Sequence, residues 1–147
     1  MAKYQNIGVG IVVRDSRGWI LMGKRKNSYK SGYFGIPGGR VEPHEPLLDA
    51  AKRELEEETG LCSLKLVYVG VIRDNQADDY DFIHFCFLCD KYKGDPILNE
   101  PDKCEGWLWC NPKLIPVNIL RGHKATIELV LNPKKKVIDL PLLDLSH

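Results

Sequence analysis

Runs of β-branched and aromatic residues alternate along the chain with polar segments rich in glycine and proline, which predicts strands separated by turns. The first two runs flank a turn at 15–18 and are therefore expected to pair as a hairpin. A short strand is expected just before 37–39, where the sequence PGG predicts a loop. The longer runs cover residues 7–15, 19–26, 64–73, 81–90 and 105–110.

Two other segments have the spacing of helices. Apolar residues recur at three- and four-residue intervals over 46–59, a segment that starts with proline and is followed by Gly60. Similar spacing predicts a second helix over 120–131. Strands interleaved with two helices predict a mixed α/β fold, with helices packed on a sheet, in a single domain over residues 1–147.

Composition and charge narrow the class of protein. The 147-residue chain is 44% hydrophobic and 28% charged, which suits one globular domain with a core. Its 21 basic and 20 acidic residues nearly cancel, so no general field attracts it to nucleic acid or anionic lipid. No apolar run is long enough to span a bilayer, and residues 1–15 lack the pattern of a signal peptide. We therefore expect a cytoplasmic protein that binds neither nucleic acid nor membrane.

The positions of the cysteines and histidines do not point to a zinc site, a disulfide or a catalytic base. Cys86 and Cys89 have a ligand-like spacing, but residues three apart in a strand point to opposite faces, so we expect core thiols rather than zinc ligands or disulfides. His84 lies in the same predicted strand and is expected to be a satisfied core residue. His44 and His123 have no partner visible in the sequence.

Three carboxylates, on Glu54, Glu57 and Glu58, lie on one face of the first predicted helix, because their positions are i, i+3 and i+4. They fall in its last turns, where the helix dipole is negative and each acid costs about 0.3–1 kcal/mol. Arg53 is placed to hold Glu57 by paired hydrogen bonds. Acids that cannot neutralise one another predict a site for a hard cation, Mg²⁺ or Mn²⁺. A charged surface helix without a ligand is the alternative that the helix alone leaves open.

The residues before this helix complete a longer pattern. From Gly39, five residues lead to Glu45, and seven more lead to Arg53 and the run ELEEETGL. Every fixed position over residues 39–61 resembles the Nudix box. The resemblance to the Nudix hydrolase family implies an α/β/α sandwich with a mixed central sheet. It also implies hydrolysis of a nucleoside diphosphate linked to another moiety.

The same resemblance implies roles for the residues of the box. Glu57 and Glu58 would be metal ligands, and Glu54 would be a third ligand or the base that activates water. A backbone carbonyl at Gly39 or its neighbour would complete the coordination of the metal, and Arg53 would orient the carboxylates. The implied catalytic residues are therefore Glu54, Glu57 and Arg53.

Segments outside the box are similar to the MutT-like branch, which cleaves (deoxy)nucleoside triphosphates to monophosphate and pyrophosphate. Lys24 and Arg25 end a predicted strand and suit phosphate oxygens, although a solvated role explains them equally well. Tyr33 and Phe34 are adjacent, so at most one of them would face a base. Gly38 permits tight backbone geometry beside the substrate.

Candidates further along the chain are less constrained. Relatives often place another metal ligand or base-contacting acid in the segment that holds Glu100, Asp102 and Glu105, and we favour Glu105. Trp107 and Trp109 offer further aromatic surfaces, for which core packing is the simpler explanation.

The leading hypothesis is Mg²⁺-dependent hydrolysis of nucleoside triphosphates, normal or oxidised, by a monomer or homodimer. Residues 23–41 also resemble the GDP-mannose branch of the family, so a nucleoside diphosphate-sugar or dinucleotide substrate is the alternative. That branch departs from the consensus in the acidic helix, whereas this chain keeps every carboxylate, which favours attack at phosphorus. A nucleotide-binding sensor without turnover is a remote third possibility.

Overall fold

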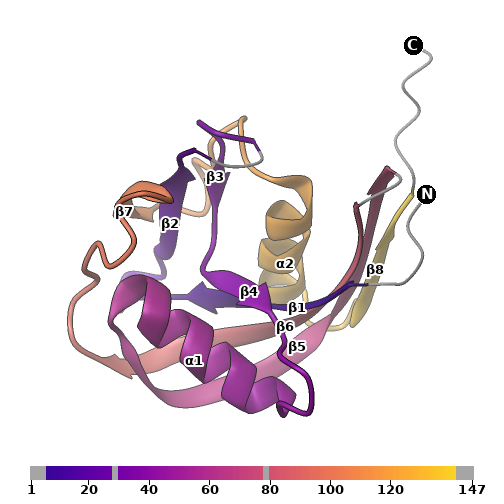
Figure 1. The fold of residues 1–147 in the computed structure, drawn as a ribbon, viewed down its shortest axis with the longest axis horizontal. Coiled ribbons are helices and arrows are strands. Elements are labelled where there is room, and N and C mark those ends of the chain that lie inside the picture. Colours follow the sequence, from indigo (N-terminus) through magenta and orange to yellow (C-terminus); the bar gives the residue numbers. More distant parts are fainter. Residues whose placement is uncertain (1–5, 28–29, 78–79, 142–147) are drawn as a thin grey trace.

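A computed structural model describes residues 6–27, 30–77 and 80–141 of the chain (Figure 1). Its helices are α1 (Leu47–Thr59) and α2 (Arg121–Leu131). Its strands are β1 (Asn6–Val13), β2 (Ile20–Arg25), β3 (Phe34–Gly35), β4 (Gly38–Arg40), β5 (Cys62–Ala77), β6 (Tyr80–Lys93), β7 (Cys104–Cys110) and β8 (Val137–Leu140).

The strands form two sheets. The larger has the order β4-β1-β6-β5-β8, in which β1 runs parallel to β6, β5 runs parallel to β8, and the other neighbours are antiparallel. The smaller has the order β3-β2-β7 and is antiparallel. The predicted mixed central sheet is therefore confirmed.

The predicted hairpin between the first two strands is wrong. Strands β1 and β2 belong to different sheets, and among the described residues a single bridge, Arg14–Ile20, joins the two segments. Both edges of β1 are already hydrogen-bonded, one to β4 and the other to β6. The side chain of Asp15 accepts hydrogen bonds from the backbone N–H groups of Arg17 and Trp19, which turns the chain from one sheet into the other.

The two helices cover opposite faces of the larger sheet (Figure 1). Alternate residues of β1 make this visible, because side chains along a strand point to opposite faces. Val9 and Ile11 pack in one core cluster with Leu55 of α1, whereas Val12 packs in another with Ile127 of α2. The α/β/α sandwich implied by the sequence is confirmed.

Two glycines in β1 leave space on the α2 side of the sheet. Gly8 and Gly10 alternate with Val9 and therefore face α2. A Cβ on Gly8 would come within 3.1 Å of Nδ1 of His84, and a Cβ on Gly10 would come within 3.5 Å of Ile36. Gly10 lines the cavity described below, and Gly8 leaves room for the imidazole of His84.

The five cysteines are free thiols. Cys86 packs beside α2, and Cys89 packs in the cluster that includes α1, so the two lie on opposite faces of β6 as predicted.

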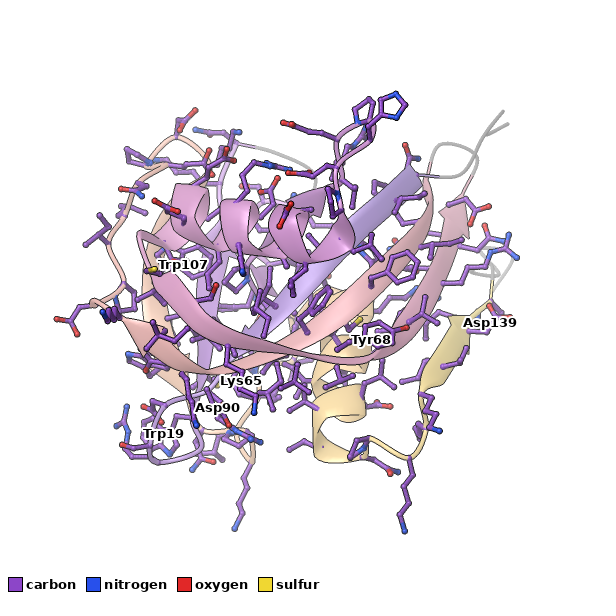
Figure 2. The ribbon with its side chains drawn as sticks, turned by 90° about the horizontal axis from the view of Figure 1, so that it is seen from below. Trp19, Lys65, Tyr68, Asp90, Trp107 and Asp139 are labelled. Carbon is purple, nitrogen blue, oxygen red and sulfur yellow. The ribbon has the colours of Figure 1, made fainter. Side chains whose placement is uncertain are left out.

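Three segments differ from the predicted elements. The expected loop at 37–39 is mostly strand β4, which pairs with β1. Strands β5 and β6 extend into the polar segment that was predicted to separate them, because Asp74 and Gln76 are satisfied within the strand: Asp74 Oδ2 accepts a 2.9 Å hydrogen bond from Gln76, and Oδ1 accepts one of 2.8 Å from Arg121. Strand β8, with Asp139 labelled in Figure 2, was not predicted.

In the described part of the chain, no helix has the length and apolar character needed to cross a bilayer.

Candidate metal and nucleotide site

Helix α1 ends as the sequence predicts. Gly60 is left-handed, with φ of 74°, and its N–H donates to the carbonyl of Glu56. The hydroxyl of Thr59 donates to the carbonyl of Leu55 at 2.6 Å. The last turn contains no basic residue, so its glutamates meet the negative end of the helix dipole without a cation at that end.

Arg53 organises the carboxylates, but not in the predicted pairing. Its Nε and one terminal nitrogen donate to Glu45 at 2.7 and 2.9 Å, so its paired hydrogen bonds go to Glu45. The other terminal nitrogen donates to Glu54 at 2.9 Å and to Glu57 at 3.2 Å. The predicted contact between Arg53 and Glu57 is present, but as one hydrogen bond rather than two, because the loop before α1 folds back and presents Glu45 to the guanidinium. These hydrogen bonds lower the pKa of Glu45 to about 2.

Glu54 and Glu58 are carboxylates that the protein leaves poorly compensated. The Glu54 side chain is 14% exposed, and its burial raises the pKa, outweighing Arg53. Burial, together with the negative charge of Glu54, raises the pKa of Glu58 to about 8. Within the described residues, the hydrogen bond to Glu58 is a single 3.2 Å bond from the N–H of Gly38 to Oε2. Both carboxylates would be stabilised by a nearby cation.

The donor set fits a hard divalent cation. Carboxylate oxygens and a backbone carbonyl beside them are the ligands that Mg²⁺ and Mn²⁺ prefer. Gly39 packs directly on Glu54, because a Cβ on Gly39 would lie 2.3 Å from the Glu54 carboxyl carbon. Between residues 6 and 141, in the described ranges, no three acidic, histidine or cysteine side chains already gather around one point. The side chain of Glu57 is 55% exposed and forms an ion pair with Arg53.

A cavity of about 1360 Å³ joins these carboxylates to distant parts of the chain. Its acidic lining residues are Glu54, Glu57, Glu58, Glu100 and Asp102, and its cationic ones are Lys24, Arg25, Lys30, Arg40 and Lys103. A third group comes from β5, β6 and the α2 side of the sheet, and we call it the β6–α2 wall. It comprises Gln76, Phe82, His84, His123 and Thr126.

Several predicted residues line this cavity together. Lys24, Arg25, Gly38 and Gly39 are all in its wall. Lys26 instead donates a hydrogen bond to the carbonyl of Pro101. The two cations that line the cavity, Lys24 and Arg25, are adjacent, whereas a regular strand would present alternate residues. The pairing of β2 with β7 shifts register between Gly23 and Arg25, so regular alternation does not hold there.

The predicted base-stacking residues lie elsewhere. Phe34 packs against the core cluster beside α2, and the ring of Tyr33 has the Lys30 ammonium 5.0 Å from its centroid. Neither lines the cavity, because the residues that β3 and its successor present there are Gly35 and Ile36.

Of the two tryptophans, Trp107 lines the cavity and Trp109 does not. The indole of Trp107 donates to the carbonyl of Glu58 at 3.2 Å and lies beside α1 in Figure 2. Trp109 is stacked with Tyr92, with ring centroids 6.1 Å apart. The core-packing explanation therefore suits Trp109 fully and Trp107 in part.

Glu105 was favoured from the sequence as another metal ligand, but of these two acids it is Glu100 that lines the cavity. Glu105 does not line the cavity and forms a 3.5 Å ion pair with Lys24. Glu100 lines the cavity, and its charge contributes to the raised pKa of Glu54 and Glu58. The loop before Glu100 is tied to the end of α1, since Asn99 donates to the carbonyl of Glu56. No local spacing in the sequence reveals this contact.

The β6–α2 wall was missed. His84 was expected to be a satisfied core residue, which is wrong: in the described part of the chain, its buried Nε2 has no hydrogen-bond partner. His123 has a partner that the sequence did not reveal, because its Nδ1 accepts the N–H of Ile36 at 2.8 Å. Burial lowers the pKa of both imidazoles, that of His123 to about 3.

The model of the NUDIX domain family matches residues 5–131 of the chain. The chain belongs to the Nudix family. Its sequence is 28% identical to an RNA pyrophosphohydrolase of Bartonella bacilliformis, over 89% of this chain and 92% of that protein. It is also 28% identical to a putative 8-oxo-dGTP diphosphatase of Bacillus subtilis, over 82% of this chain and 76% of that protein.

Its fold is also that of a solved Nudix structure. The MutT Nudix hydrolase of Burkholderia pseudomallei superposes with a TM-score of 0.82 at 28% identity, over 87% of this chain and 99% of that one. The chain is therefore a Nudix hydrolase with a MutT-like fold, a nucleotide pyrophosphohydrolase. Enzymes of this family generally use divalent metal ions.

Proposed function

We propose that this Nudix hydrolase cleaves nucleoside triphosphates, oxidised ones among them, to nucleoside monophosphate and pyrophosphate with Mg²⁺. The observation that carries the proposal is the joining of three box carboxylates and two strand-end cations, Lys24 and Arg25, in one cavity. At about 1360 Å³ the cavity is larger than most sites for small ligands and has room for a nucleotide with its phosphate chain.

The metal site would use the carboxylates of Glu57 and Glu58, with Glu54 and the backbone carbonyl of Gly39 beside them. Mg²⁺, or Mn²⁺ in its place, would supply positive charge to the phosphate oxygens and lower the pKa of a bound water. Arg53 supports this arrangement by holding Glu54 and Glu57 from the same guanidinium nitrogen.

The remaining residues bind and orient the substrate. Lys24 and Arg25 offer charge-assisted hydrogen bonds to phosphate oxygens. Water attacks phosphorus in line with the leaving oxygen, as in phosphoryl transfer generally. Glu54, whose side chain is only 14% exposed, either completes the metal site or accepts the proton of that water.

The relatives support a polyphosphate substrate. The B. subtilis protein is named for an oxidised deoxynucleoside triphosphate and the B. bacilliformis protein for RNA. We expect the free nucleotide, because the net charge of +1 offers no field for a polymeric anion.

The test is product analysis in water enriched in heavy oxygen. Purified protein is incubated with Mg²⁺ and normal and oxidised nucleoside triphosphates, a GDP-sugar, ADP-ribose and a triphosphorylated RNA oligonucleotide. Pyrophosphate and monophosphate from the free triphosphates, with the label on a phosphate, support the proposal. Free sugar carrying the label supports the GDP-mannose type of reaction instead. Cleavage of ADP-ribose alone or of RNA alone, or binding of nucleotides without any product, would also overturn the proposal.

A further inference from the structure

The β6–α2 wall differs in chemistry from the rest of the cavity. Its side chains are aromatic or polar, and burial lowers the pKa of both histidines, so the two imidazoles are uncharged at neutral pH. Uncharged groups of this kind do not compensate a phosphate. They suit a flat, uncharged ring with hydrogen-bonding atoms on its edge, as a nucleobase has.

One atom of this wall lacks a partner. Nε2 of His84 is buried and makes no hydrogen bond to any described residue, whereas Nδ1 of His123 is already used by the N–H of Ile36. Leaving a buried polar atom without a partner destabilises a fold. A ligand that pairs with this nitrogen restores the missing hydrogen bond, and a ligand that cannot pair with it gains nothing there.

The neighbours of His84 fix the direction of that hydrogen bond. Phe82 stacks on the imidazole, with ring centroids 5.2 Å apart and an interplanar angle of 9°. On the adjacent strand, Gly8 leaves room for the ring, since a Cβ there would lie 3.1 Å from Nδ1. A ring nitrogen forms its hydrogen bond in the plane of the ring, so these contacts orient the bond as well as the imidazole.

We propose that His84 is a specificity-determining residue, whose Nε2 forms a hydrogen bond with the edge of the substrate's nucleobase. Phe82 is then a positioning residue, which holds the imidazole in the required plane. The inference rests on the proposed function in that the substrate is a nucleotide. It adds the residue that distinguishes one base from another.

Binding without turnover tests the proposal. Dissociation constants are measured by calorimetry for the monophosphates of several purine and pyrimidine nucleosides and for ribose phosphate, which has no base. His84→Phe keeps a flat ring against Phe82 and removes both nitrogens. The control is His44→Asn, an exposed histidine outside the cavity whose φ of 65° asparagine tolerates.

The wild-type protein is expected to prefer at least one monophosphate over ribose phosphate by about ten-fold or more. In His84→Phe the ratio of the two dissociation constants is expected to fall about ten-fold, because only the contact to the base is lost. The affinity for ribose phosphate should be unchanged. The melting temperature of the variant should be unchanged or higher, since an unpaired buried nitrogen has gone. His44→Asn should match the wild type in every measurement.

Two results would overturn the proposal: an unchanged base preference in His84→Phe, or an equal loss of affinity for ribose phosphate. Should His84→Phe melt at a lower temperature, His84→Gln decides, because glutamine keeps a hydrogen-bonding group and should keep part of the preference. Equal base preference in His84→Gln and His84→Phe would also overturn it. Pyrophosphate release is assayed separately. A protein whose base preference depends on His84 but that cleaves no triphosphate would contradict the proposed function and leave this proposal standing.

Discussion

The end of α1 and the β6–α2 wall border one cavity, yet burial acts on them with different consequences. At the end of α1, burial raises the pKa of Glu54 and Glu58, and the negative charges of nearby acids raise it further. In the wall, burial lowers the pKa of His84 and His123. In both regions the charged form is disfavoured because the group has lost contact with water.

The difference lies in what each group does next. A histidine that loses its proton is neutral and can still donate or accept a hydrogen bond, so the wall needs no counter-ion. The glutamates are crowded together, and burial outweighs the nearby guanidinium groups of Arg53 and Arg25. Either protons or a bound cation would relieve their repulsion. Variants at the end of α1 should therefore reduce metal-dependent turnover, whereas variants in the β6–α2 wall should leave turnover largely intact.

The largest effect is expected for Glu57→Gln. The variant loses a charged oxygen ligand, and turnover should fall by at least ~100-fold. Glu57 is largely exposed, so the melting temperature should stay within a few degrees of the wild type. The matched control is Glu56→Gln, an exposed neighbour that does not line the cavity and should keep full activity. Near-normal turnover of Glu57→Gln in a pyrophosphate-release assay would remove Glu57 from the site.

A smaller loss is expected for Arg53→Lys. Lysine keeps the charge but cannot hold Glu45 by paired hydrogen bonds while also reaching Glu54. Turnover should fall about ten-fold, as is typical when a group that orients metal ligands is changed. Lys52→Arg, an exposed exchange one residue earlier, is the control and should be neutral. Full activity of Arg53→Lys over a range of Mg²⁺ concentrations would show that charge alone suffices.

Glu100→Gln should have a modest effect on the apparent affinity for Mg²⁺. Removing one nearby charge is worth about 1 kcal/mol or less at a partly solvated position, which corresponds to a weakening of up to about five-fold. Glu105→Gln should weaken Mg²⁺ activation by less than about two-fold, because its ion pair with Lys24 is exposed. A larger effect of Glu105→Gln, measured by titrating activity with Mg²⁺, would restore the preference drawn from the sequence.

His123→Asn should affect activity least and change how stability depends on pH. The pKa of His123 is about 3 in the folded protein, mainly through burial, with the charges of His84 and Arg25 adding to the shift, against 6.5 for an ordinary histidine. Between these values the unfolded chain binds more protons, so stability falls as the pH falls, by up to ~1.4 kcal/mol per pH unit. Urea unfolding of wild type and variant between about pH 7 and 4 should give a shallower slope for the variant. Equal slopes would contradict the neutral, buried imidazole.

The elements that the sequence predicted well are those specified by local spacing. Helix α1 and its end at Gly60 follow from residues within one segment, and so does the Nudix box. Strand β4 was read as a loop because PGG is a turn signal, and β8 was missed because its four residues follow a lysine run. The prediction that the first two strands pair as a hairpin was wrong because β4 and β6, which are distant in sequence, occupy both edges of β1.

The site shows the same division. The box residues could be assigned from their spacing, and Lys24 and Arg25 from their place at the end of a strand. Glu100 and His84 could not, because each reaches the cavity through a contact made in three dimensions. Glu100 is brought there by a loop tied to the end of α1, and His84 by the register of β6 beside a glycine of β1.

Direct measurement of metal binding tests the central claim that the glutamates of α1 hold divalent ions. Mn²⁺ is titrated into the protein without nucleotide, and bound ion is followed by its paramagnetic resonance signal, for wild type and Glu58→Gln. We expect the wild type to bind Mn²⁺ at or below about millimolar concentration and Glu58→Gln to bind at least ~10-fold more weakly. Absence of bound Mn²⁺ at that concentration, or equal affinity in the two proteins, would contradict the account.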